Sequence, residues 1–298
     1  MSTDLRLRPV PHMRHTGPTP YTDRVLSRLL RHVAPVLAAA VFLLPLALMV
    51  SGSLRPTGLA PPQGVELVPA SPTLDAYRRL PELVPVWTWL RNSTIVVALA
   101  VPITVLVASW AAFGIRMLPR RQRRVAVLAV LAVLLVPVTS VWTTRFELFR
   151  VVGAVDTFVP LVAPAFAATT PFFVLIYLWS FTGVPDAQLE AARLEGASAW
   201  RLWQGVAMPQ AKLATLAVAV LAFTTHWANF IDALLYLDSA NLYTLPLGLQ
   251  LLQLLNPTDW PLLMAGAVIA TAPAVAAFML AQRLFLDDPL HGLRGRRT

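Results

Sequence analysis

The chain has 298 residues, of which 57% are hydrophobic and only 13% are charged. A soluble domain of this length carries about a quarter charged residues, so the composition indicates a protein that crosses a membrane several times. The net charge is +9 and there is no cysteine, which excludes disulfides, thiolate catalysis and cysteine-based metal sites.

Apolar runs of about 20 residues, the length needed to cross a bilayer, predict six transmembrane helices. They lie at 33–52, 90–113, 124–144, 158–182, 212–233 and 260–283. The expected fold class is therefore an all-α membrane protein. Prolines inside these runs are compatible with a membrane bundle, where neighbouring helices satisfy the freed backbone groups.

Residues 1–32 form a polar lead before the first apolar run. A cleaved signal peptide is the alternative interpretation, but both the lead and the apolar run are longer than such peptides have. We therefore expect a cytoplasmic tail at 1–32 and a retained transmembrane helix at 33–52. After this helix we expect an extracytoplasmic loop at 53–89, a five-helix core at 90–283 and a cytoplasmic tail at 284–298.

The basic residues are distributed unevenly between the two sides of the membrane. With six helices, one side carries 18 of the 24 lysines and arginines, and the positive-inside rule assigns it to the cytoplasm. Both termini and the connection at 185–209 are then expected to lie in the cytoplasm, and the chain is expected to be a multi-pass membrane protein. The run "FGIRMLPRRQRRV" is read as a topology determinant, ahead of binding to lipid head groups. The net positive charge does not indicate nucleic-acid binding, because no RNA-binding or zinc-finger pattern accompanies it.

The connection at 185–209, "PDAQLEAARLEGASAWRLWQGVAMP", is charged and rich in helix-forming residues. Pro185 and Asp186 favour a helix start, Gly196 interrupts the helix, and Pro209 is expected to end a second short helix. Apolar residues repeat along one face of that second helix, at Trp200, Trp203 and Val206. The pattern predicts a helix–turn–helix under the membrane, either a docking element or an ordinary interfacial amphipathic helix.

"EAARLEGASAWRLWQGVAMP" resembles the EAA loop of bacterial ABC-importer permeases, E-A-A-x-x-D-G-A followed, after about nine residues, by a hydrophobic residue, x and Pro. Glu195 replaces the usual aspartate, and the positions that match are Glu190, Ala191, Ala192, Gly196, Ala197 and Pro209. Over most of its length the chain resembles the MalG-like carbohydrate branch, through "SLRP", "RNSTIVV", "VGAVDT" and "HWANF". In the last of these, Ala228 replaces the family asparagine, and the glycine-rich ending of the family is replaced by "GLRGRR".

The resemblance implies the type I importer permease fold, with a cytoplasmic coupling helix between helices 4 and 5. It implies that Glu190, Ala191, Ala192, Glu195, Gly196, Ala197 and Pro209 couple the chain to an ATPase subunit. It also implies a location in the bacterial inner membrane. The partners it implies are a second homologous permease, two ABC ATPase subunits and an extracytoplasmic solute-binding protein. The only lysine, Lys212, follows Ala211, so a phosphate-binding loop is absent from the sequence, and ATP with magnesium is expected on the partner subunits. No cofactor or metal is expected in this chain.

Polar residues gather near the end of the fifth predicted helix and are candidates for the solute path, because polar groups inside a membrane are costly. They are Thr225, His226, Trp227, Asn229 and Asp232, with a weaker second set in the fourth helix, Thr170 and Trp179. The alternative is a polar helix end at the outer interface, with Trp227 in an aromatic belt.

The expected function is the permease subunit of an ATP-driven importer for a sugar, an oligosaccharide or a related polyol, without enzymatic activity of its own. An ABC permease for another solute is the alternative. A multi-span membrane enzyme, such as a lipid-linked glycosyltransferase, and an ion-coupled carrier fit less well. The enzyme would need clustered carboxylates or a metal motif, and the carrier would need carboxylates in mid-helix.

Overall fold

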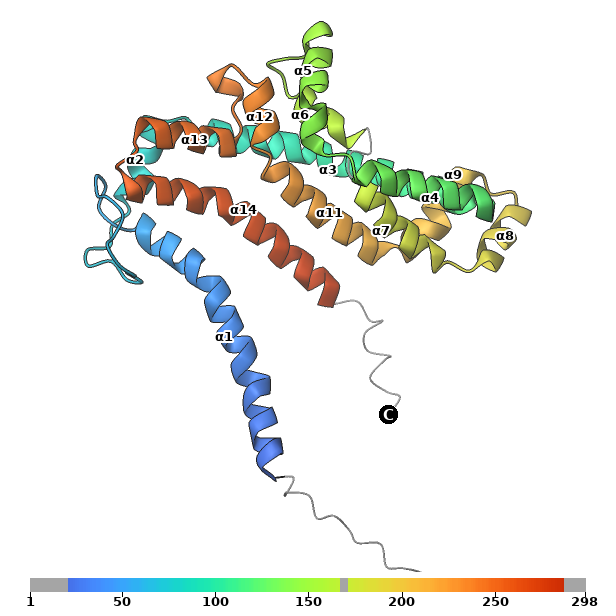
Figure 1. The fold of residues 1–298 in the computed structure, drawn as a ribbon, viewed down its shortest axis with the longest axis horizontal. Coiled ribbons are helices and arrows are strands. Elements are labelled where there is room, and N and C mark those ends of the chain that lie inside the picture. Colours follow the sequence, from blue (N-terminus) through green and yellow to red (C-terminus); the bar gives the residue numbers. More distant parts are fainter. Residues whose placement is uncertain (1–20, 167–170, 287–298) are drawn as a thin grey trace, which may run out of the picture. The chain divides into compact units, whose positions relative to one another are not determined.

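The computed structural model describes residues 21–166 and 171–286, and every regular element in these ranges is helical (Figure 1). The predicted tails therefore lie partly outside the described residues, and Thr170 lies outside them entirely. The part of the chain up to Leu48 and the part from Met49 onward are separate compact units, and each is described by itself.

Helix α1 (Tyr21–Ser53) contains the predicted span at 33–52 and begins earlier than that prediction. Its segment Val33–Ser53 is long and apolar enough to cross a membrane. Large apolar side chains on it are exposed, including Phe42 at 80%. Because exposed apolar surface of this extent is unfavourable in water, these side chains are suited to lipid or to a partner chain.

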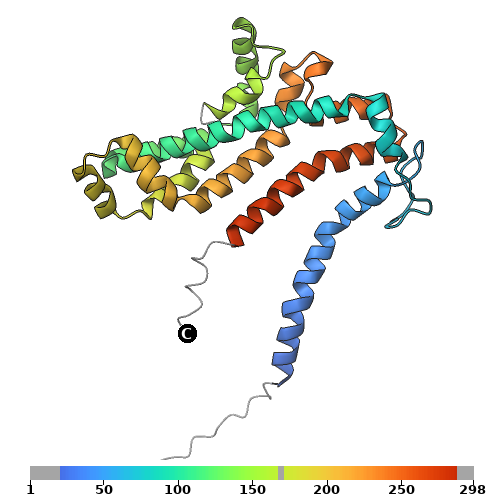
Figure 2. The same ribbon diagram turned by 180° about the vertical axis from the view of Figure 1, so that it is seen from behind.

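The long helix α3 (Val86–Met117) is the centre of the second unit. Figures 1 and 2 show it alongside α7 (Pro171–Thr182) and α11 (Lys212–Trp227). The buried residues of α3 recur every three or four positions, which is the period of one helix face. Three of them are alanines, which permit close packing of neighbouring helices: Ala100, Ala108 and Ala112.

The Asn-Ser pair near the start of α3 holds the segment before α13 (Leu245–Leu255). The side-chain amide of Asn92 donates to the carbonyls of Asn241 at 2.8 Å and Tyr243 at 3.0 Å. The hydroxyl of Ser93 accepts from the backbone N–H of Leu245 at 2.8 Å. These buried bonds link two parts of the chain about 150 residues apart, so this pair has a structural role.

Helix α13 and the short α2 (Asp75–Leu83) were not among the predicted elements. Both are shorter than a membrane span, so a search for long apolar runs does not detect them. They pack against α3 and α14 (Trp260–Leu286). Gly248 of α13 lies directly on the ring of Trp89, where a Cβ atom would come within 2.1 Å.

Two predicted helices are wrong as continuous elements, and proline accounts for the break in the first of them. The run at 124–144 is divided into α4 (Arg120–Leu134) and η1–α5 (Val138–Val151), bent by 84° at Pro137. Proline lacks an N–H donor and disfavours the helical conformation of the residue before it. The run at 158–182 contains α6 (Val159–Val162) and η2 (Ala163–Ala165), with Pro160 and Pro164 in them, before α7.

The predicted helix at 212–233 is also divided. Helix α11 ends at Trp227, and α12 (Ile231–Tyr236) begins after a three-residue break. The side-chain oxygen of Asn229 accepts from the backbone N–H of Asp232 at 3.2 Å, which stabilises the start of the second piece. A 3₁₀ turn, η4 (Ala240–Leu242), follows.

By length and composition, the described residues contain three helices able to cross a membrane, or up to six spans if each bent pair is one span. The remaining elements form the connection between α7 and α11. They are α8 (Asp186–Leu194), α9 (Ala199–Leu202), a π-helical turn (Trp203–Ala207) and α10 (Met208–Gln210).

Candidate functional site

The connection between α7 and α11 begins at a point that one arginine holds in place. The Arg116 guanidinium, at the end of α3, donates to the carbonyls of Phe181 at 3.3 Å and Val184 at 3.4 Å, and it pairs with the Asp186 carboxylate. These bonds tie the end of α7 and the segment after it to α3, and Asp186 places a carboxylate in the first turn of α8. Arg116 lowers the pKa of Asp186 below its usual value, so the pair is lost only as pH falls through that lowered pKa.

The turn between α8 and α9 is built on Gly196, as predicted. Its φ of +81° lies in the left-handed region that favours glycine. The N–H of Ala197 donates to the carbonyl of Ala192 at 3.0 Å and that of Gly196 to Arg193 at 2.9 Å, which is the Schellman pattern of helix termination. Next, Ser198 starts α9, and its hydroxyl accepts from the backbone N–H of Arg201.

The inner side of this hairpin, residues 186–211, packs into the core of the helical unit. Leu189, Leu202 and Trp203 are buried in one apolar cluster with residues of α3, α7 and α11. The ring of Trp203 lies 4.8 Å from that of Trp200 and 5.9 Å from that of Trp110 on α3. The hairpin is therefore joined to three long helices, and it is not a loose interfacial segment.

The second short helical segment was predicted to end at Pro209, and it ends one residue later, at Gln210. Helical structure continues through α10, and the chain bends by 86° at Ala211 before α11. The π-helical turn just before Pro209 changes the hydrogen-bond register, which accommodates a residue that cannot donate.

The residues predicted to couple to an ATPase divide into two groups. Those that the structure leaves exposed are Glu190, Ala191, Glu195, Gly196 and Pro209, whereas Ala192 and Ala197 are half-buried against the core of the chain itself. Leu194 was not predicted, yet it is 90% exposed at the end of α8. An apolar side chain this exposed, beside Glu195, makes the outer edge of the hairpin suitable for docking a protein.

A second feature is a cavity of about 450 Å³ beside the break between α11 and α12. It brings together four predicted solute-path residues: Thr225, His226, Asn229 and Asp232. Two lining residues that were not predicted are Trp142 and Arg145 of α5.

The polar groups of this cavity form a connected set. The Arg145 guanidinium lies 3.5 Å from the Asp232 carboxylate, and the two side chains are only 19% and 12% exposed. The Asn229 side chain donates to the same carboxylate at 2.9 Å. The ring of His226 lies 3.5 Å from the Thr104 hydroxyl. The cavity thus contains one cation, one carboxylate and several neutral donors and acceptors.

The other predicted path residues lie elsewhere. Trp227 is buried and does not line the cavity: its Nε1 donates to the carbonyl of Ala270 at 2.9 Å, and its ring stacks on Phe223. Trp179 on α7 is 81% exposed and lies outside the cavity lining. Among the described residues, no group of histidines and carboxylates has an arrangement that could hold a metal ion.

Comparisons with known proteins identify relatives over most of the chain, although no family model matches. The chain is 29% identical to the trehalose/maltose transport system permease protein MalG of Thermococcus litoralis, over 89% of this chain and 96% of that protein. It is 27% identical to the arabinooligosaccharides transport system permease protein AraQ of Halalkalibacterium halodurans, over 89% of this chain and 95% of that one.

Among solved structures, a chain of a bacterial ABC transporter involved in the import of the acidic polysaccharide alginate matches with a TM-score of 0.72. The identity is 19%, and the match covers 91% of this chain and all of that one, so the fold is shared. Relatives, fold and hairpin motif agree. The chain is thus similar in sequence to sugar permease subunits of ABC transporters over 89% of its length, and it shares the fold of an ABC-importer permease.

Proposed function

We propose that the chain is the transmembrane subunit of an ATP-driven importer for a sugar, an oligosaccharide or a related polyol. The main support is the α8–α9 hairpin, which is anchored to α3 by Arg116 and presents an exposed edge that includes Glu190 and Leu194. The inner side of the hairpin is packed into the core and its outer edge is exposed. It can therefore transmit a movement of a bound partner to the membrane helices.

The partner on the hairpin is an ABC ATPase subunit, two of which serve a complex that also contains a second, homologous permease. ATP with magnesium binds to those subunits, and this chain performs no hydrolysis itself. Both termini and the hairpin face the cytoplasm, in agreement with the distribution of basic residues. An extracytoplasmic binding protein delivers the solute on the opposite side.

The cavity beside α12 lies on the solute path. Asp232 and Asn229 supply hydrogen-bonding groups suited to hydroxyls, and Trp142 supplies an aromatic face for a sugar ring. Because the charge of Arg145 is offset by the Asp232 carboxylate at 3.5 Å, the cavity is suited to a neutral polyhydroxylated solute.

Closure of the ATPase subunits moves the hairpin, and the hairpin moves α3, α7 and α11 through its buried residues. Since the cavity is lined from α11 and from the segment after it, movement of α11 relative to α4 and α5 changes access to the cavity. This is alternating access driven from the hairpin.

The test is purification of the chain in mild detergent from its native membrane. We expect an ATPase and a second permease to co-purify, and the reconstituted complex to import a sugar in an ATP-dependent manner once its binding protein is identified by a ligand screen. Import of a non-sugar solute would contradict the carbohydrate assignment alone. Purification of a stable, active chain without any ATPase would contradict the importer assignment and favour a membrane enzyme or a carrier.

A further inference from the structure

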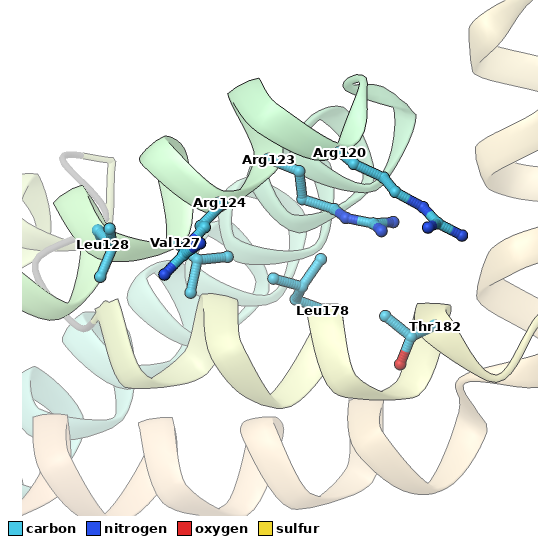
Figure 3. A pocket seen from close by; sticks show the side chains of 7 residues that line it. All are labelled: Arg120, Arg123, Arg124, Val127, Leu128, Leu178 and Thr182. Atoms are coloured by element: carbon cyan, nitrogen blue, oxygen red, sulfur yellow. The ribbon is translucent and has the colours of Figure 1, made fainter.

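A cavity of about 420 Å³ lies between α4 and α7, outside the hairpin and the solute cavity. Figure 3 shows its two walls: Arg120, Arg123 and Arg124 extend from α4, and Leu178 and Thr182 face them from α7. Val127 and Leu128 continue the α4 wall one turn beyond the arginines. The cavity therefore has a basic end and an apolar end.

Among the described residues, the arginines of the basic end form no ion pair of their own. Within the described part of the chain, the four ion pairs involve none of the three arginines that line the cavity. The nearby carboxylate of Asp186 is bound to Arg116, and its pKa is lowered by Arg116 first and then by Arg123 and Arg120. Three arginines within five residues of one helix line the same cavity, and their like charges favour a bound anion here.

The apolar end continues along a surface suited to lipid. After Arg124, α4 consists only of apolar residues as far as Leu134. Its largely exposed residues include Val125 at 62%, Leu128 at 55% and Leu131 at 42%. The arginines thus mark the boundary between an apolar helix surface and the polar region, which is where phospholipid head groups lie.

Thr182 contributes no donor at this place. Its hydroxyl donates to the carbonyl of Trp179 at 2.6 Å, so only its lone pairs remain available. The donors that face the cavity are therefore the guanidiniums. Their planar N–H groups match phosphate oxygens in a bidentate manner.

We propose that the α4–α7 cavity binds one anionic phospholipid, with its phosphate on Arg120, Arg123 and Arg124 and an acyl chain along Val127 and Leu128. Because the cavity has both basic and apolar side chains, its ligand needs both an anionic group and an apolar chain. An acidic protein segment would satisfy the arginines but would leave the exposed α4 surface without an apolar partner. A phospholipid satisfies both, and its net negative charge distinguishes it from a zwitterionic lipid.

The experiment measures binding of phosphatidylglycerol and phosphatidylcholine to the full-length chain in delipidated detergent micelles by native mass spectrometry. We expect phosphatidylglycerol to bind about tenfold more tightly. Replacing a groove arginine in Arg123→Gln or Arg124→Gln weakens that binding about fivefold each, because an arginine near the lipid surface contributes this much to anion attraction. Binding of phosphatidylcholine is expected to stay unchanged.

Two controls separate the groove from a general basic surface. Arg121→Gln lies in the same basic run but does not line the cavity, so it is expected to reduce binding less than twofold. Arg123→Lys keeps the charge and is expected to retain most of the binding. Equal binding of the two lipids, or an equal loss in Arg121→Gln and Arg123→Gln, would overturn the proposal. Displacement of phosphatidylglycerol from the groove by the assembled ATPase subunit would also overturn it and assign the groove to a protein contact.

Discussion

The turn at Gly196 permits a sharp test of the hairpin as a mechanical element. Its φ of +81° costs an ordinary L-residue about 1–2 kcal/mol, whereas asparagine adopts this conformation more readily. No atom of the chain lies within 4 Å of a Cβ built at this position, so the cost arises from the backbone and not from a clash. A penalty of this size reduces the population of the hairpin conformation by about 5- to 30-fold.

The assay is the number of solute molecules imported per ATP hydrolysed by the reconstituted complex. Gly196→Ala is expected to lower this ratio several-fold at unchanged expression, and Gly196→Asn to lower it less. Hydrogen exchange at the amides of Glu195, Gly196 and Ala197 is expected to quicken in the same order, because the Schellman bonds open. Full coupling in Gly196→Ala, or an equal loss in both variants, would refute the role of the backbone conformation.

Three further changes have calculable effects. Gly248→Ala brings a Cβ to 2.1 Å from the fully buried ring of Trp89, and overpacking of this kind is expected to cost at least 1–3 kcal/mol, seen as a lower thermal midpoint in detergent. Asp232→Asn leaves Arg145 without its carboxylate, so the uptake KM for the solute is expected to rise about tenfold at similar expression. Arg116→Gln removes two bonds to carbonyls at the end of α7, about 1–3 kcal/mol together, and is expected to quicken hydrogen exchange in α8 while the rest of α3 stays protected.

Each of these changes has a matched control in the same chain. Gly114→Ala in α3 meets no atom within 4 Å and is expected to be neutral or slightly stabilising. Asp238→Asn removes an exposed carboxylate outside the solute cavity and should leave the KM unchanged. Arg121→Gln removes a charge from the neighbouring basic segment and leaves both Arg116 bonds to the carbonyls in place. If a control variant has the same effect as the variant it is matched to, the contact assigned to that matched variant is contradicted.

The hairpin could be predicted from sequence because its signals are local. Pro185 and Asp186 mark the start of α8, Gly196 marks the turn, and all three lie where the structure has them. The bond from Arg116 to Asp186 could not be predicted, because the two residues are 70 positions apart and only the packing of α3 against α7 brings them together. Local pattern thus predicts the shape of the hairpin but not its anchor.

The solute cavity shows the same limit. His226, Asn229 and Asp232 were predicted because polar residues are unexpected in an apolar run. Arg145 was not predicted as a cavity residue, since its partner Asp232 lies 87 positions away. Trp227 belongs to the same polar segment, but the helix places its side chain on the opposite side, against Ala270. Composition alone does not tell in which direction a side chain points from a helix that ends in a break.

The boundaries of the membrane helices were predicted least well. Hydropathy treats 124–144 as one run, since the residues around Pro137 are as apolar as the rest. The break there depends on the missing N–H donor of proline and on the packing that accepts an 84° bend. The short α13 is equally apolar, and its length alone separates it from the spans.

The central claim, that the hairpin edge contacts an ATPase subunit, is tested most directly by photo-cross-linking. A benzophenone amino acid replaces Leu194, which is 90% exposed at the end of α8, and a second replaces Val125, which is 62% exposed on α4. In the intact complex we expect the residue at 194 to form an adduct with the ATPase and the residue at 125 to form none. Absence of an ATPase adduct at 194 in a complex that retains its ATPase would contradict the account.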